Sequence, residues 1–423
     1  MSLVVQMSGK ASKNNDLGSD KLSDVIALDV SEGHSYVVWY AHGVCQSEFQ
    51  VLHTQSGFAK LLKLALRANQ PTVYFEATGV YSRPVERFCC DNHLPYCRLN
   101  PLDLKLKTNG LRRLKTDSQD AHRIARAALS NDFRITQPRT VIYTRLRELT
   151  RFHGRIQADM HVKHVLLHTQ LQQTFPELEQ LFSSRVSKLA LNIVSLFPHP
   201  DLVNGLSRTV LKNRLMQSTD KKLSKAKGLK YAEKLQSLAK DSYPAVNSDS
   251  VQVQAVRYYC RALINLTIKK EHLIKQLVVL AQNLPEFDVL TSMPGIGVQS
   301  AAELIGELGN IQRFDNANQL NAFVGIDINR YQSGKYLRQD HINKRGDPKA
   351  RMILYLIVKN MIRAQHAAPN HIVDYYYQLK NGPIPKRNKV ATVACMNKTL
   401  YCLFSMVQAN QKYDYTYHGL VVP

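Results

Sequence analysis

The sequence is short of cysteine, of long apolar runs and of acidic residues, and each shortage excludes a class of protein. Its seven cysteines are odd in number and few for 423 residues, which excludes the disulfide framework of a small secreted protein. No uninterrupted apolar stretch reaches the ~18 residues of a membrane span. The first 24 residues are polar rather than signal-like. We therefore expect a cytoplasmic protein with no membrane partner.

Two kinds of site are also disfavoured by what is missing. Cys89, Cys90 and Cys97 lie close together in the sequence, but no second pair follows at the spacing of a zinc site, so ordinary buried thiols are expected there. There is no G-x-x-x-x-G-K-[ST] loop for a nucleoside triphosphate. The protein is therefore not expected to depend on structural zinc or on ATP.

Basic residues dominate the charge. The 56 Lys and Arg exceed the 33 Asp and Glu, which gives a formal net charge of +23 and a pI of about 9.7. Such an excess favours a polyanionic partner, and nucleic acid or an anionic membrane surface would both satisfy it. Hydrophobic residues make up 44% of the chain, as in folded proteins. Its length predicts two or three domains.

The residue pattern divides the chain into four segments. Residues 1–24 are polar and predict a flexible arm. Residues 25–143 alternate between strand and helix patterns, whereas 144–284 are almost entirely helical with apolar spacing near 3.5, typical of an antiparallel coiled-coil pair. Residues 285–423 form a third, mainly helical region. Prolines and a basic run interrupt the helical segment at 180–245, and the pattern assigns no role to that stretch.

The first folded segment predicts a mixed sheet. Strands are expected at 24–30, 35–41, 47–52, 72–77 and 96–100, and helices at 56–69 and from Tyr81. Three successive strands followed by alternating helices and strands indicate a mixed α/β sheet covered by helices.

Four acidic residues of this segment form a candidate metal site. Asp29 ends the first strand and Glu76 the fourth, so a sheet that sets these strands side by side brings both carboxylates to one edge. Asp117 and Asp120 are three residues apart, on one helical face. Clustered carboxylates are suitable ligands for Mg²⁺ or Mn²⁺, and two such ions about 4 Å apart can promote phosphodiester exchange. The preceding Arg112, Arg113 and Lys115 would hold phosphate.

Each acid also has a purely structural interpretation. Asp117 would be a helix N-cap with Asp120 at the third helical position, and Asp29 and Glu76 would be exposed strand ends. We favour the metal site because the four acids follow a strand and helix order similar to that of ribonuclease H.

Two motifs of the last segment are candidate phosphate contacts. Pro294-Gly295-Ile296-Gly297 resembles the turn of a helix-hairpin-helix, whose glycines let backbone N–H groups approach a phosphate. The alternative is a plain connection between two helices. Further on, Ser333 precedes a glycine in a polar loop.

The loop around Ser333 has no strong catalytic signature of its own. Lys335, Lys344 and Arg345 follow the serine, but no G-x-S-x-G motif surrounds it. Composition alone favours a β-turn there, followed by a helix with Asp347 as its N-cap and Pro348 at its first position.

As a set, the four acids, PGIG, AFVGIDINRYQSGK and INKRGDPKAR closely resemble one family. It is the DEDD-type serine recombinases of insertion sequences, the bridge-RNA-guided transposases, and the similarity spans about residues 25–410. The resemblance implies a RuvC-like (RNase H-like) catalytic domain, a coiled-coil dimerisation region and a C-terminal transposase domain with a helix-hairpin-helix.

The resemblance also implies a mechanism and partners. Ser333 would be the nucleophile that forms a covalent link to DNA, beside the Mg²⁺ or Mn²⁺ held by the four acids. The acids of one subunit would meet the serine of another in a dimer or tetramer. A noncoding RNA from the element would pair with target and donor DNA and select both.

Two other functions remain open from the residues. A junction-resolving or RNase H-like nuclease would use the same acids with water as nucleophile, but it leaves the QSGK motif unexplained. A non-catalytic scaffold that binds nucleic-acid backbones leaves the four acids unexplained.

Overall fold

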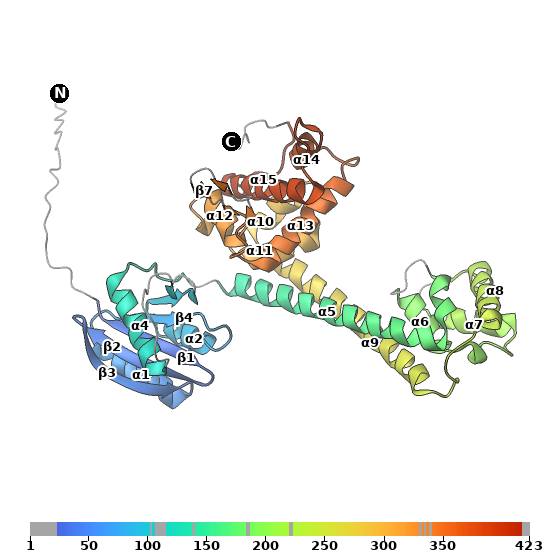
Figure 1. Cartoon of the computed structure of the whole chain (residues 1–423), viewed down its shortest axis with the longest axis horizontal. Coiled ribbons are helices and arrows are strands. Elements are labelled where there is room, and N and C mark those ends of the chain that lie inside the picture. The colour runs from blue at the N-terminus through green and yellow to red at the C-terminus, as the bar shows by residue number, and fades with distance from the viewer. Residues whose placement is uncertain are drawn as a thin grey trace, which may run out of the picture. The chain divides into compact units, whose positions relative to one another are not determined.

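A computed structural model describes residues 23–101, 104–105, 116–137, 140–182, 187–219, 223–329, 332–333, 336–337 and 341–416. The expected arm, 1–24, lies outside these residues except for its last two positions. The chain divides into two compact units, 1–138 and 139–423, which are described separately (Figure 1).

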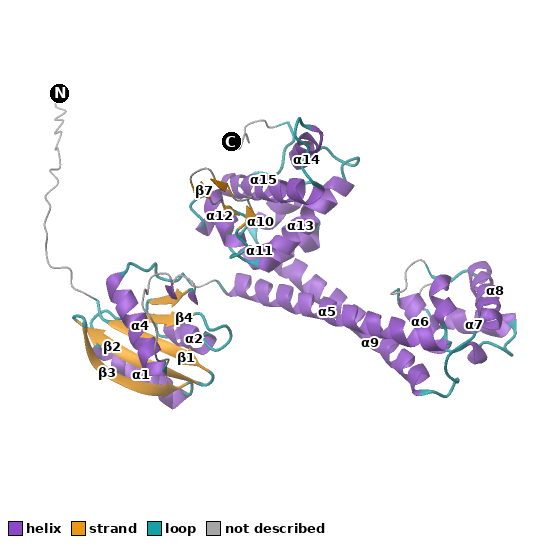
Figure 2. Ribbon diagram, in the orientation of Figure 1, coloured by secondary structure: helices purple, strands orange, loops and turns teal. Residues whose placement is uncertain are grey.

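The first unit contains a five-stranded mixed sheet (Figure 2). Its strands are β1 (Val25–Ser31), β2 (His34–Ala41), β3 (Val44–Leu52), β4 (Thr72–Glu76) and β5 (Tyr96–Leu99). They lie in the order β3-β2-β1-β4-β5. Pairing is antiparallel among the first three strands and parallel between β1 and β4 and between β4 and β5. The mixed sheet predicted from the sequence is thus confirmed.

Helices pack on both faces of this sheet because its inner strands are apolar on both sides. Ile26, Leu28 and Val30 of β1 pack with α1 (Gln55–Arg67) and α2 (Arg83–Asp91). The intervening Val25 and Ala27 pack with α4 (Asp117–Ser130) on the opposite face. Strand geometry turns successive side chains to opposite faces, so every second position of β1 faces α4.

Two long antiparallel helices form the spine of the second unit. Near the start of α5 (Val141–Thr174), Leu146 packs in one core with Leu277, near the end of α9 (Val251–Ala281). At the other end of the pair, Leu171 packs in a second core with Cys260. That second core also contains α6 (Lys188–Leu196), α7 (Arg208–Gln217) and α8 (Lys225–Asp241), with short 3₁₀ turns at Pro176–Leu181 and Pro200–Leu202.

The remaining helices surround the first of these cores. They are α10 (Pro285–Thr291), α11 (Val298–Leu308), α12 (Ala317–Val324), α13 (Pro348–Arg363), α14 (His371–Asn381) and α15 (Asn388–Ala409), with a 3₁₀ turn at Ile311–Arg313. Four two-residue strands lie between α12 and α13: β6 (Ile328–Asn329), β7 (Gln332–Ser333), β8 (Tyr336–Leu337) and β9 (His341–Ile342). The expected domain boundaries at 143/144 and 284/285 stay predictions, since the helix pair contributes to the cores at both of its ends.

Helix α15 is the one described helix long and apolar enough to cross a membrane by length and composition. More than half of its most apolar window, 56%, is buried inside the protein. Cys395, Leu400 and Leu403 lie in the core with α11 and α13. We interpret α15 as a core helix, because a buried helix meets the same composition test.

Candidate active site and relatives

The parallel pairing of β1 and β4 brings two of the four acids to one edge of the sheet. Leu28 is in register with Phe75, so Asp29 and Glu76 each occupy the next position at the carboxyl ends of their strands. Both side chains alternate to the α4 face, because Leu28 and Phe75 belong to the core on the other face. Both residues are partly buried. Asp29 and Glu76 therefore lie at one edge of the sheet, as predicted from the sequence.

Helix α4 contributes the other two acids, in different environments. Ala121, Ile124 and Ala125 are fully buried and hold the helix against the sheet. The side chain of Asp120 is only 12% exposed, whereas that of Asp117 is 58% exposed. Asp117 Oδ2 lies 3.9 Å from His34 Nε2, at the start of β2. Asp120 thus lies at the buried face of α4, and Asp117 lies at its rim.

The cap of α4 differs from the structural alternative considered for Asp117. Thr116 is the N-cap, and its Oγ1 accepts a hydrogen bond from the Gln119 N–H at 3.3 Å. Asp117 is therefore the first helical residue and Asp120 the fourth. Since a threonine already performs the capping, the two aspartates are not required for it.

A basic side chain, Arg123, lies between two of these acids. Its Nη2 is 3.6 Å from Glu76 Oε2, and its Nε is 3.9 Å from Asp120 Oδ1. The Nε atom is buried and has no hydrogen-bond partner. Arg123 therefore offsets the carboxylate charge without forming close bonds to either acid.

The described residues contain no group of three or more His, Cys, Asp or Glu close enough to hold a metal ion. The carboxylate oxygens of Asp29, Glu76 and Asp120 are nevertheless the donor type that Mg²⁺ and Mn²⁺ prefer. These acids fit a divalent ion in chemistry, and Arg123 lies near Glu76 and Asp120 as a counter-charge.

A hydrogen-bond chain that the sequence did not reveal fixes the first turn of α4. Glu48 Oε2 of β3 accepts from His122 Nε2 at 2.9 Å and from Ser118 Oγ at 3.2 Å. The hydroxyl of Tyr40 on β2 pairs with His122 Nδ1 at 2.9 Å. The hydrogen bond from His122, with a second from Tyr36, lowers the pKa of Glu48. The only sequence signal was the four-residue spacing of Ser118 and His122.

The PGIG turn connects α10 and α11. Gly295 has φ +93°, and a Cβ there would lie 2.7 Å from the Met361 Cα of α13, so only glycine fits. Gly297 is the N-cap of α11, with no side-chain cap and open space around it. The predicted turn between two helices is present, whereas its role in phosphate binding stays a prediction.

The serine segment lies between α12 and α13. Ser333 of β7 is in register with Tyr336 of β8, in a short antiparallel hairpin. Lys344, with φ +61°, and Arg345 are exposed. Asp347 caps α13 as predicted, since its Oδ1 accepts from the Lys349 and Ala350 N–H groups. The side chains of Ser333 and Lys335, and all of Arg112, Arg113 and Lys115, lie outside the described residues.

Two family models match this chain. Residues 26–176 match a model described as a transposase, of the DEDD type found in IS110 elements. Residues 288–373 match the model of the transposase IS116/IS110/IS902 family. The first match covers the sheet, α4 and α5, and the second covers α10–α13 and the start of α14.

Two relatives are similar to parts of the chain. The insertion element IS110 uncharacterized 43.6 kDa protein of Streptomyces coelicolor is 24% identical over 310 residues, which are 71% of this chain and 72% of the relative. The putative transposase y4rJ of Sinorhizobium fredii is 30% identical over 122 residues, which are 29% of this chain and 30% of the relative.

A mixed sheet with acids at one edge, joined to a segment shared with insertion-element proteins, defines an enzyme of DNA transposition. The two matched segments, in this order along the chain, are those of IS110-family transposases, and they identify the protein as a DNA transposase. DEDD transposases of this kind generally depend on divalent metal ions.

Proposed function

We propose that this transposase excises and inserts its element by RNA-guided recombination through a covalent serine–DNA intermediate. The observation that supports this most is the placement of Asp29 and Glu76 at the carboxyl ends of two parallel strands, on the face of the sheet against which α4 packs with Asp120. Such an edge exposes carboxylates to a DNA backbone while the strands behind it stay packed.

The proposed site has an acidic part and a nucleophilic part. Asp29, Glu76, Asp117 and Asp120 would hold one or two Mg²⁺ ions, which supply charge stabilisation for phosphodiester exchange. Ser333 Oγ attacks the phosphorus atom and loses its proton to solvent or a carboxylate, while the bond to the leaving deoxyribose oxygen breaks and that oxygen takes a proton from solvent to become a free hydroxyl. The serine–phosphate ester conserves the bond energy, so strand exchange requires no ATP.

Substrate binding is shared among basic groups. Arg112, Arg113 and Lys115 precede α4, and Lys335, Lys344 and Arg345 flank or follow the serine hairpin. The N–H groups near Gly295 and Gly297 add a backbone contact to phosphate. These groups grip phosphates without reading sequence, so we assign target choice to base pairing by a noncoding RNA of the element.

The decisive experiment compares wild type with Ser333→Ala on labelled DNA carrying the element ends, in Mg²⁺ and with transcribed flanking RNA. A denaturing gel should show a protein-linked DNA band for wild type and none for Ser333→Ala. Ser237→Ala, an exposed serine on α8, serves as the matched control and should behave like wild type.

The same gel distinguishes the alternatives. A Ser333→Ala protein that still cleaves at the wild-type rate would indicate a RuvC-like or RNase H-like nuclease with water as nucleophile. A wild-type protein that binds DNA without cleaving it under any of these conditions would indicate a scaffold. Recombination that proceeds unchanged without the flanking RNA would refute RNA guidance but not the serine mechanism.

A further inference from the structure

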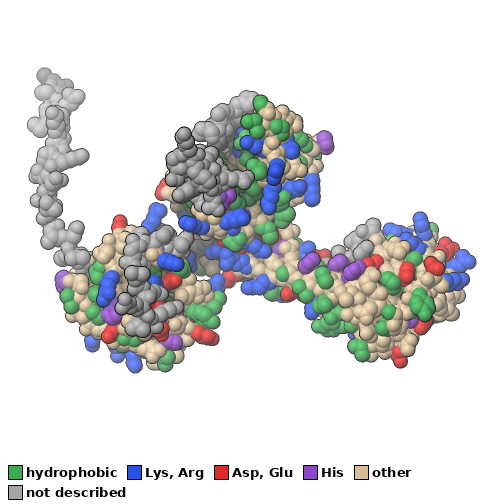
Figure 3. Space-filling view, viewed as in Figure 1, with side chains coloured by type: hydrophobic (Ala, Val, Ile, Leu, Met, Phe, Trp, Pro, Cys, Tyr) green, Lys and Arg blue, Asp and Glu red, His purple; other side chains and the backbone are tan. Residues whose placement is uncertain are grey.

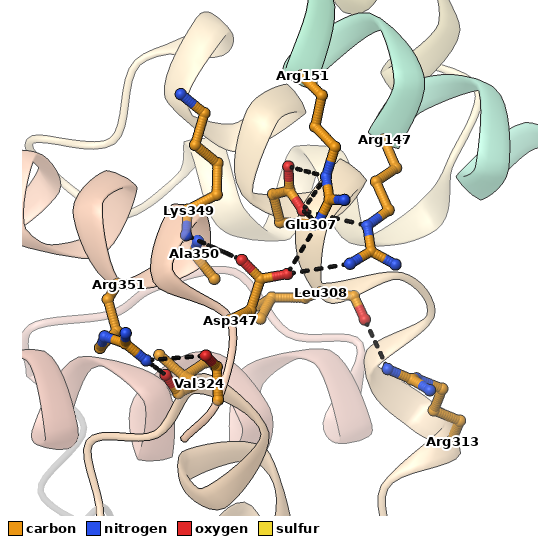
Figure 4. Close-up of polar contacts among 11 residues, drawn as sticks. Arg147, Arg151, Glu307, Leu308, Arg313, Val324, Asp347, Lys349, Ala350 and Arg351 are labelled. Atoms are coloured by element: carbon orange, nitrogen blue, oxygen red, sulfur yellow. Dashed lines mark hydrogen bonds and ion pairs between the residues drawn. The ribbon is translucent and has the colours of Figure 1, made fainter. Parts of the chain in front are cut away.

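A cluster of ionic side chains joins α5 to α11 and α13 (Figure 4). Arg147 and Arg151, one helical turn apart on α5, both reach the buried Glu307 of α11, each at 3.2 Å. The same two guanidinium groups contact Asp347 Oδ2 at 3.1 and 3.4 Å. Two acids from separate segments therefore hold two arginines in fixed positions.

The acids orient the arginines but leave part of each guanidinium unused. The described hydrogen bonds of Arg147 and Arg151 involve Nε and Nη2, so the Nη1 donors have no protein partner among the described residues. Their side chains are 27% and 44% exposed, whereas Glu307 is completely buried. The Nη1 donors of both groups thus remain available for charge-assisted hydrogen bonds to an anion such as phosphate.

Lys349 adds a third cation through an unusual contact. A Cβ on Gly154, in the middle of α5, would lie 2.3 Å from Lys349 Nζ. Glycine inside a helix is less favourable than alanine, and at this position it gives the ammonium group room to lie against the helix. Within the described part of the chain, Nζ has no hydrogen-bond or ion-pair partner. Lys349 is partly buried, so its ammonium group is not fully hydrated.

The whole cluster carries an excess of positive charge. Burial lowers the pKa of the Arg313 guanidinium, and the positive charge of the neighbouring Arg147 lowers it further. Arg147 and Arg151 pair with the two carboxylates, whereas Lys349 and Arg313 have no acidic partner among the described residues, which leaves a formal charge of 4 − 2 = +2. Figure 3 shows Lys and Arg side chains gathered along this part of α5, beneath the C-terminal helices.

We propose that Arg147, Arg151 and Lys349 form a binding site for a backbone phosphate of duplex DNA. This inference rests on the proposed function, because it assigns a specific contact to the DNA on which a transposase acts. Its residues come from both segments that match IS110-family transposases, 26–176 and 288–373. The site lies beside Asp347, the N-cap of α13, which is the helix that follows the segment containing Ser333.

The test measures binding of the full-length protein to a fluorescent 30-base-pair duplex across a salt series. Lys349→Gln should reduce affinity several-fold and decrease the slope of log affinity against log salt by about 0.9, the value for one phosphate contact. Gly154→Ala should reduce affinity in the same direction while the Tm stays equal or rises, since alanine favours the helix but displaces the ammonium group. Arg147 and Arg151 are left intact because their loss would strand buried Glu307 without a counter-charge.

Lys240→Gln, an exposed lysine on α8, is the control for loss of one charge and should bind nearly as wild type does. Wild-type binding by both Lys349→Gln and Gly154→Ala would overturn the proposed site, and so would an equal loss in Lys240→Gln. A defect seen only with RNA of the same length would overturn the assignment to DNA. A wild-type protein that binds the duplex but carries out no strand exchange would contradict the proposed recombination and leave the phosphate site intact.

Discussion

Asp117 and Asp120 are one helical turn apart, yet their surroundings give them unequal parts in the acidic face. The buried Asp120 has Arg123 as counter-charge, whereas Asp117 is largely exposed and lies near His34. A carboxylate held at a packed face loses little freedom when it binds an ion, whereas an exposed one must first be ordered. We therefore expect Asp120 to contribute more to metal affinity than Asp117.

Asp120→Asn tests this expectation without changing the shape of the side chain. It should weaken Mn²⁺ binding at least tenfold and abolish strand exchange, because a neutral amide is a poorer ligand for a divalent ion. Asp117→Asn should weaken Mn²⁺ binding less. Electron paramagnetic resonance of free Mn²⁺ measures both, with Asp91→Asn on α2 as the control. Wild-type affinity in Asp120→Asn would exclude this residue from the metal site.

The thiols provide a second test at this scale. Burial raises the pKa of Cys89, Cys260 and Cys395 to about 12. Because the thiolate is the reactive form, these three should resist alkylation in the native protein at pH 8. Cys90 is exposed and should react first. Mass spectrometry after timed iodoacetamide treatment checks the order, and rapid labelling of Cys260 would contradict the packing of α9.

At the scale of elements, prediction from the sequence succeeded where neighbours in the chain determine the structure. The strand at Val25–Ser31 follows from a continuous apolar run, and the start of α13 follows from Asp347 and Pro348. The link from Glu48 to His122 joins residues 74 positions apart, and that from Arg147 to Asp347 joins residues 200 apart. No local pattern encodes such contacts, so Glu48 and His122 were missed.

The buried carboxyl of Glu307 predicts how the joint of α5 with α11 responds to pH. Burial is the largest influence and raises its pKa above the ordinary value of 4.5, although both arginines oppose the rise. A raised native pKa means that the contribution of this group to stability is full below pH 4.5 and is lost as the pH rises through the native value.

Glu307→Gln removes that titration. The free energy of unfolding of wild type minus that of the variant should therefore increase as the pH falls from 7 to 5. Urea denaturation of both proteins at several pH values measures this difference. A difference that decreases over the same range would show that pairing with Arg147 and Arg151 outweighs burial.

At the scale of the whole molecule, the helix pair carries apolar side chains that its own cores leave uncovered. Val162, Val165 and Ile268 are 48 to 55% exposed, and Tyr258 is 59% exposed. Burial of apolar area of this kind against a second copy would stabilise a dimer. In that dimer the acids of one subunit would meet Ser333 of the other, the arrangement that the resemblance to bridge-RNA-guided transposases implies.

Replacement of both valines, Val162→Asp with Val165→Asp, should convert the dimer to monomer and abolish strand exchange. Light scattering after gel filtration, with DNA and RNA present, gives the mass. Val251→Asp, at a more exposed valine at the start of α9, should remain dimeric. A wild-type protein that is monomeric under these conditions would refute the shared site.

The length of helix α5 sets the distance between two hydrophobic cores. Its 34 residues at 1.5 Å each span about 51 Å, and its two ends lie in different hydrophobic cores. Any change in its length alters the distance between these cores. It also rotates one core relative to the other about the helix axis, since one inserted residue turns everything beyond it by about 100°. Seven residues inserted into both α5 and α9 nearly restore the phase while adding about 10 Å. The helix pair therefore tolerates insertions that add whole helical turns to both helices, whereas insertions of a fraction of a turn would misalign the two cores.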